Sequence, residues 1–152
     1  MSERIDIFSD GGSRGNPGPS ACAFVAVVGA GGSDFIGGRA IRRNSRYLGI
    51  GTNNEAEYAG LIDALKWARS RGLTEVTLHS DSELLVHQMD GSYKVRAEKL
   101  KPLYAEAKSL LIGVKYEVVH HRREHPWISR CDEMVNEALD DQKDLVIIRR
   151  QG

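Results

Sequence analysis

Four acidic residues, spread along the sequence, lie where the end of a strand or helix is expected to meet the core. They are Asp10, Glu57, Asp81 and Asp132. If these carboxylates converge, their like charges raise one another's pKa, a penalty that a bound divalent cation removes. Carboxylate oxygens suit Mg²⁺ or Mn²⁺, and two such ions about 4 Å apart can support phosphoryl displacement. The set therefore indicates a metal-dependent site for phosphoryl chemistry.

Three of these acids also have a simpler structural explanation. Asp10 can be a turn aspartate, since two glycines follow it. Asp81 follows a short apolar stretch and can cap the next helix. Asp132 lies three residues after Ser129, which is the spacing of a capping box. Each residue alone is thus compatible with a purely structural role, and the functional hypothesis rests on the set.

The segment TNNEAEY begins a helical pattern that runs from Thr52 to about Ser70. Thr52 and Glu55 have the spacing of a capping box, which explains Glu55 structurally. Glu57 shares its helix face with apolar residues, namely Leu61, Ala64, Leu65 and Ala68. A buried carboxylate costs free energy unless it is hydrogen-bonded, paired or bound to a cation. Glu57 is therefore predicted to face the core, either as a hydrogen-bonded glutamate or as a metal ligand.

The elements that must position these acids follow from periodicity. Residues 4–9, 21–28 and 34–46 alternate as strands, and the glycine-rich turns between them indicate an antiparallel meander. Further elements are expected at 52–70 (helix), 75–79 (strand), 82–89 (helix), 97–112 (helix), 115–121 (strand) and 129–140 (helix). Three strands followed by alternating strands and helices predict an α/β domain with a mixed sheet covered by helices.

The chain has 152 residues and is expected to form one domain over residues 1–142. A tail over residues 143–152 follows. The pattern leaves two alternatives open for this tail, an additional edge strand or a disordered segment.

The formal net charge is zero, so overall charge gives no argument for a nucleic-acid partner. Basic residues do cluster at 39–46, 94–101 and 122–130, which is weak support for a polyanion. The apolar runs are too short to span a membrane, and no signal peptide is visible. Cys22 and Cys131 have neither CxxC nor zinc spacing. A reducing, cytoplasmic setting is expected, with a monomer that needs no obligatory protein partner.

Four sequence blocks resemble, in order and spacing, those of type 1 ribonuclease H. Between about residue 4 and residue 141 they read DGGSRGNPGPSA, TNNEAEYAGLIDAL, HSDSELLV and SRCDEMVNEAL. The resemblance implies a ribonuclease H-like, five-stranded mixed sheet flanked by helices. It also implies a two-metal-ion endonuclease that cuts the RNA strand of an RNA–DNA hybrid and leaves 5′-phosphate ends. The acids in these blocks, implied as ligands of Mg²⁺ or Mn²⁺, are Asp10, Glu57, Asp81 and Asp132.

The resemblance also implies contacts with the substrate. Asn16, Asn53 and Asn54 are expected to contact the ribose 2′-OH, which distinguishes RNA from DNA. Thr52 is expected at a phosphate of the DNA strand, unless the helix cap occupies its hydroxyl. The glycines that begin with Gly11 are expected to let the nucleic-acid backbone approach the metal site.

The sequence departs from many family members in two places. MDGSYKVRAEKLKPLY passes directly to the next helix, so the chain resembles the branch that lacks a basic handle. Many members have a mobile histidine about ten residues before the last acid, and this sequence has Arg122 there. We expect Arg122 to stand near the scissile phosphate. His121 is the nearest histidine that could fill the role instead.

Two other functions remain open at this stage. The same fold could act on double-stranded RNA or branched DNA, because a fold does not determine a substrate. The chain could also be a non-catalytic nucleic-acid-binding module. The three asparagines favour RNA, and the four acids argue against a non-catalytic role.

Overall fold

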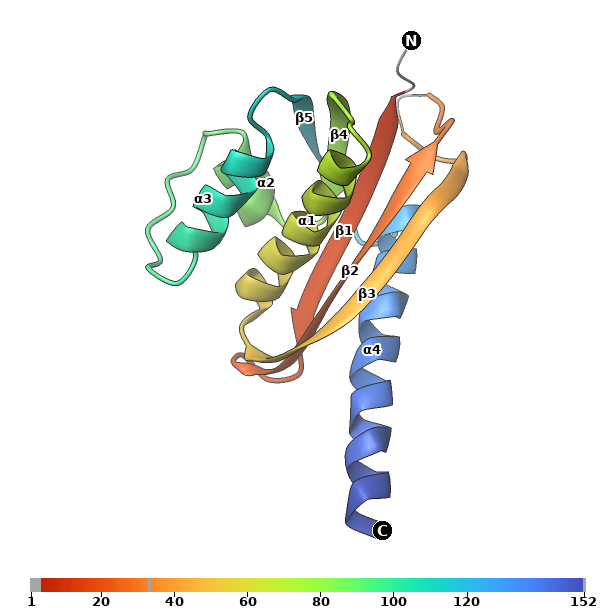
Figure 1. Cartoon of the computed structure of the whole chain (residues 1–152), viewed down its shortest axis with the longest axis vertical. Coiled ribbons are helices and arrows are strands. Elements are labelled where there is room, and N and C mark those ends of the chain that lie inside the picture. Colours follow the sequence, from red (N-terminus) through yellow and green to blue (C-terminus); the bar gives the residue numbers. More distant parts are fainter. Residues whose placement is uncertain (1–3, 33, 152) are drawn as a thin grey trace.

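The computed structural model describes residues 4–32 and 34–151, with side chains up to Gln142. These residues form a mixed sheet with the strand order β3-β2-β1-β4-β5. Helices α1, α2 and α3 lie on one side of the sheet and α4 lies on the other (Figure 1). The predicted α/β architecture with a five-stranded mixed sheet is confirmed.

The strands are β1 (Ile5–Ser13), β2 (Gly18–Val28), β3 (Arg39–Gly51), β4 (Glu75–Ser80) and β5 (Lys115–His120). Strands β1, β2 and β3 pair antiparallel, as the meander pattern predicted, whereas β4 is parallel to both β1 and β5. β1 is longer than predicted because it pairs with β2 as far as Ser13. Asp10 therefore lies inside a strand, opposite Ala23, and is not a turn aspartate.

The helices are α1 (Asn53–Ser70), α2 (Glu83–Met89), α3 (Lys101–Leu110) and α4 (Pro126–Gln151). The predicted capping box of α1 is confirmed, because the Thr52 hydroxyl accepts from the Glu55 amide and the Glu55 carboxylate accepts from the Thr52 amide. Residues 90–100, all of which the structure describes, form no further helix between α2 and α3, in agreement with the absence of a handle. None of the described helices is long and apolar enough to cross a membrane.

Helix α1 packs very closely against β1, and glycines make this possible. A Cβ atom on Gly11 would lie 2.5 Å from the amide nitrogen of Glu57, and one on Gly60 would lie 2.8 Å from the carbonyl oxygen of Asp10. Contacts this short do not occur between real side chains and backbone. Gly11 is thus required by the approach of α1, a reason that the sequence analysis missed. The close packing brings Glu57 of α1 beside Asp10.

Helix α4 begins at Pro126 and continues well past Asp140, where the pattern predicted its end. No glycine or proline occurs between residues 127 and 151, so the chain contains no residue that would stop the helix earlier. The edge-strand alternative for the tail is therefore wrong for residues 143–151, which are helical, and Gly152 lies outside the described residues. The final turns of α4 extend beyond the sheet (Figure 1).

Candidate active site

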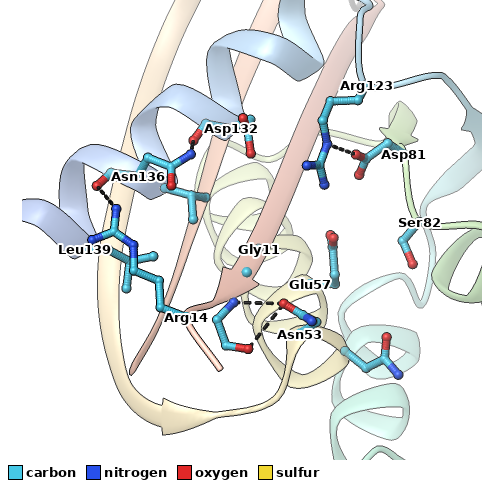
Figure 2. A pocket seen from close by; sticks show the side chains of 14 residues that line it. Gly11, Arg14, Asn53, Glu57, Asp81, Ser82, Arg123, Asp132, Asn136 and Leu139 are labelled. Atoms are coloured by element: carbon cyan, nitrogen blue, oxygen red, sulfur yellow. Dashed lines mark hydrogen bonds and ion pairs between the residues drawn. The ribbon is translucent and has the colours of Figure 1, made fainter. Parts of the chain in front are cut away.

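A pocket of about 560 Å³ lies between α1, α4 and the region where β4 leads into α2 (Figure 2). Three of the four predicted acids line it, Glu57 from α1, Asp81 from the end of β4 and Asp132 from α4. The fourth, Asp10, is buried next to Glu57 on β1. The fold thus brings together acids that are up to 122 positions apart in the sequence.

The carboxylates of Asp10, Glu57 and Asp81 form the centre of this site. Each offers an oxygen atom, and these atoms lie within 4.8 Å of one another. Asp10 is only 1% exposed and Glu57 only 8%. Asp132 lies across the pocket from Glu57 and Asp81 (Figure 2). Three of the four acids thus converge as expected, and Asp132 lines the same pocket.

The surroundings of the buried acids disfavour their charged forms. Burial, followed by the charges of Asp81 and Asp132, raises the pKa of Asp10 to about 7. Burial, followed by the charges of Asp10 and Asp81, raises the pKa of Glu57 well above its usual value. The Oδ1 atom of Asp10 and the Oε2 atom of Glu57 are buried without a hydrogen-bond partner among the described residues. Buried oxygens without a partner cost free energy, so this donor set fits a hard divalent cation.

The structure does not support the simpler capping roles for the other two acids. Helix α2 is capped by Ser82, whose hydroxyl accepts from the amide of Leu85, so Asp81 is not its cap. Because α4 begins at Pro126, Asp132 lies within the helix and a capping box with Ser129 is wrong. Both carboxylates are thus left facing the pocket (Figure 2).

Arg123 is a site residue that the sequence analysis did not select. Its Nε atom lies 3.3 Å from Oδ2 of Asp81 (Figure 2), and the contact raises the pKa of Arg123. Arg122, the predicted cation, does not line the pocket. The sequence places two arginines side by side in the loop of residues 121–125, which has no periodicity to indicate which one turns inward.

The predicted substrate-binding residues gather around the first turn of α1. Asn53 and Asn54 line the pocket together with Gly11. The side-chain oxygen of Asn53 accepts from the amide of Ser13 at 2.9 Å, and that of Asn16 accepts from the amide of Asn53 at 3.1 Å. These contacts tie the turn after β1 to the start of α1. They use the amide oxygens, so the NH₂ groups are the donors that each side chain can offer to a ligand.

Arg14 and Asn136 also line the pocket, and the sequence analysis did not select them. An Nη atom of Arg14 lies 2.7 Å from Oδ1 of Asp140, and it also donates to the carbonyl of Asn136 at 3.4 Å (Figure 2). Arg14 thereby joins the turn after β1 to α4. The partners are more than a hundred residues apart, so no local sequence pattern could have indicated the contact.

Known proteins share this architecture over most of the chain. A family model described as "Reverse transcriptase-like" matches residues 9–128. Ribonuclease HI of Halobacterium salinarum is 38% identical over 139 residues, which cover 91% of this chain and 65% of the relative. The bifunctional protein Rv2228c of Mycobacterium tuberculosis is 35% identical over 142 residues, which cover 90% of this chain and 36% of the relative. This chain thus spans less than two thirds of the length of these curated relatives.

Solved structures match over nearly their whole length. The crystal structure of RNase H1 from Halobacterium salinarum NRC-1 has a TM-score of 0.81 at 35% identity, covering 91% of this chain and 98% of that chain. LC11-RNase H1 in complex with an RNA/DNA hybrid has a TM-score of 0.81 at 38% identity, again covering 91% and 98%. Both the fold and a substantial part of the sequence are therefore shared with these proteins.

Proposed function

Because this chain belongs to the type 1 ribonuclease H family, we propose that it is a metal-dependent endoribonuclease that hydrolyses the RNA strand of RNA–DNA hybrids. The observation that carries the proposal is the group of Asp10, Glu57 and Asp81, whose oxygens lie within 4.8 Å of one another. The similar LC11-RNase H1 is known in complex with an RNA/DNA hybrid. The expected products have 5′-phosphate ends.

The donor set supports a site for divalent metal. We assign Asp10, Glu57, Asp81 and Asp132 as the residues that would hold Mg²⁺ or Mn²⁺, with two ions per site. When bound, such ions supply an activated water and neutralise charge on the leaving oxygen. The support from this chain is the pair of buried carboxylate oxygens that have no other partner among the described residues.

Other residues of the chain bind and orient the hybrid in this proposal. The NH₂ groups of Asn16, Asn53 and Asn54 donate to ribose hydroxyls, which selects RNA. Thr52 donates its hydroxyl to a phosphate of the DNA strand, since the cap uses that hydroxyl only as an acceptor. We assign to Arg123 the role first predicted for Arg122, that of a cation near the scissile phosphate.

We also propose that residues 1–142 form the ribonuclease H domain. The protein would act as a monomer in the reducing cytoplasm. Cys22 and Cys131 are free and buried, which is compatible with a reducing compartment.

A panel of labelled substrates tests this function. The protein is incubated with an RNA–DNA hybrid, duplex RNA, duplex DNA and branched DNA, each with Mg²⁺ or Mn²⁺. We expect cleavage of the RNA strand of the hybrid alone, and Asp10→Asn serves as the inactive control. Equal cleavage of duplex RNA or branched DNA would contradict hybrid specificity. Binding of the hybrid without cleavage would indicate the non-catalytic module instead.

A further inference from the structure

A chain of hydrogen-bonded polar groups leads from β1 through β4 to the loop that carries Arg123, and the function described so far does not use it. The Nε2 atom of His79 lies 2.8 Å from Oδ1 of Asp6, and its Nδ1 atom lies 2.7 Å from Nε2 of His121. Asp6 and His79 are each 1% exposed, on the central strands β1 and β4. His121 is the first residue of the 121–125 loop, directly after β5.

The donors and acceptors in this series of hydrogen bonds determine which ring nitrogens carry a hydrogen. Asp6 accepts through its carboxylate, so His79 donates from Nε2 and accepts at Nδ1. His121 must then donate from Nε2, which fixes the tautomer of its ring. Its backbone amide also donates to the carbonyl of Ser80 at 2.9 Å. His121 is therefore fixed to the end of β4 through both its ring and its backbone.

The other end of the 121–125 loop is fixed in a similar way. The Nε2 atom of His125 lies 2.8 Å from the carbonyl oxygen of Asp34, in the turn between β2 and β3, so it donates. The Nδ1 atom accepts from the amide of Trp127 at 3.2 Å. The ring also stacks on Phe8, with 5.1 Å between the centroids, and the other stacking partner of Phe8 is His79 at 4.3 Å.

Arg123 lies between these two fixed histidines. Its side chain is 66% exposed, although that of its partner Asp81 is only 10% exposed. An ion pair with so exposed a member contributes only about 0–1 kcal/mol and restricts a long side chain. The pair is therefore too weak to hold the loop, and the position of Arg123 must come from the fixed ends.

We propose that His121 and His125 are positioning residues, which fix both ends of the 121–125 loop so that Arg123 stays at the carboxylate site. His121 acts through the buried Asp6–His79 pair, and His125 acts through the turn between β2 and β3. The consequence for turnover rests on the proposed function, whereas the placement of Arg123 does not.

The kinetic test compares His121→Ala, Arg123→Ala and the double variant on a labelled hybrid. We expect His121→Ala to lower kcat about ten-fold while KM changes by less than about two-fold. If His121 acts only through Arg123, the double variant is no slower than Arg123→Ala alone. Losses that multiply in the double variant would overturn the proposal.

Two further variants separate positioning from general damage to the fold. His121→Gln places an amide nitrogen near the former Nε2 position and can still donate to His79, so we expect it to restore most of kcat. His87→Ala, at a partly exposed histidine on α2 whose ring contacts Ser92, should match the wild type. Failure of the glutamine variant to exceed His121→Ala would contradict the hydrogen-bond chain.

A spectroscopic test needs no substrate. The Nε–H resonance of Arg123, assigned by its absence in Arg123→Ala, reports directly on the contact with Asp81. We expect this resonance in the wild type and in His121→Gln, and its loss in both His121→Ala and His125→Ala. An unchanged resonance in both alanine variants would overturn the proposal even if no hybrid is cleaved. If one alanine variant does not fold, the other decides.

Discussion

At Asp10, the negative charge that metal binding would need is opposed by the burial that the fold imposes. Its carboxylate is 1% exposed, and one of its oxygens has no hydrogen-bond partner among the described residues. Two neighbouring acids, Asp81 and Asp132, disfavour its charged form further. Acids gathered in this way destabilise the fold when no cation is bound to them.

This conflict predicts how stability depends on pH in the presence of a chelator. The folded pKa of Asp10, about 7, lies above the ordinary value of 3.8, so the folded state binds more protons between these two values. The free energy of unfolding should then fall as the pH rises from about 4 to about 7, by on the order of 2–4 kcal/mol from this group. Asp10→Asn should flatten the slope and raise the melting temperature at neutral pH. Identical pH profiles for both proteins in thermal melts would show that the acids do not interact as described.

The two adjacent arginines provide a second test on single residues. Arg123 contacts Asp81, whereas Arg122 is exposed and does not line the pocket. We expect Arg123→Ala to lower turnover of the hybrid by about ten-fold or more while binding changes less. Arg122→Ala should remain within about two-fold of the wild type. Steady-state rates and hybrid affinities measure both effects, and the reverse order would return the role to Arg122.

Among the elements, α1 and β1 determine the geometry of the site. Helix α1 carries Glu57 near its N-terminal end, and glycines at positions 11 and 60 let the helix lie directly against β1. The capping box at Thr52 was predictable because it is a local pattern. The extension of β1 to Ser13 was not predictable, because it depends on pairing with β2.

Gly60→Ala tests this close packing. The added methyl group would lie 2.8 Å from the carbonyl oxygen of Asp10, so α1 must shift. We expect a loss of about 1–3 kcal/mol in the free energy of unfolding, with a lower cleavage rate because Glu57 moves with the helix. Gly31→Ala is the matched control, since no atom lies within 4 Å of the place that its added methyl group would take. Equal denaturant midpoints for the two variants would show that α1 does not need the close approach.

The four acids could be selected from the sequence because each lies where the end of a strand or helix is expected to meet the core. The sequence did not predict the hydrogen-bond chain from Asp6 to His121. Asp6 and His79 lie in strands where polar and apolar residues alternate, a pattern that does not show which polar side chains are buried. Arg123 was not predictable either, because its loop has no periodicity.

The chain as a whole has a net charge of zero, so the proposed binding of the hybrid requires local clusters of basic residues. Neutralised phosphates release counterions, so affinity should fall steeply with salt. Fluorescence anisotropy with Asp10→Asn, which binds without cleavage, measures the dissociation constant over a range of salt concentrations. An affinity independent of salt would mean that phosphate contacts do not drive binding.

The proposed function requires that the clustered carboxylates hold the metal for RNA-strand hydrolysis. The most direct measurement is single-turnover cleavage of a strand-labelled hybrid, first with chelator and then with Mg²⁺ added in excess. The wild type is compared with Glu57→Gln and with its matched control Glu55→Gln, which keeps the capping contact on the same helix. We expect no cleavage in chelator, recovery with Mg²⁺ in the wild type and Glu55→Gln, and almost no recovery in Glu57→Gln. Cleavage in chelator, or equal damage from the two substitutions, would mean that these carboxylates do not hold a catalytic metal.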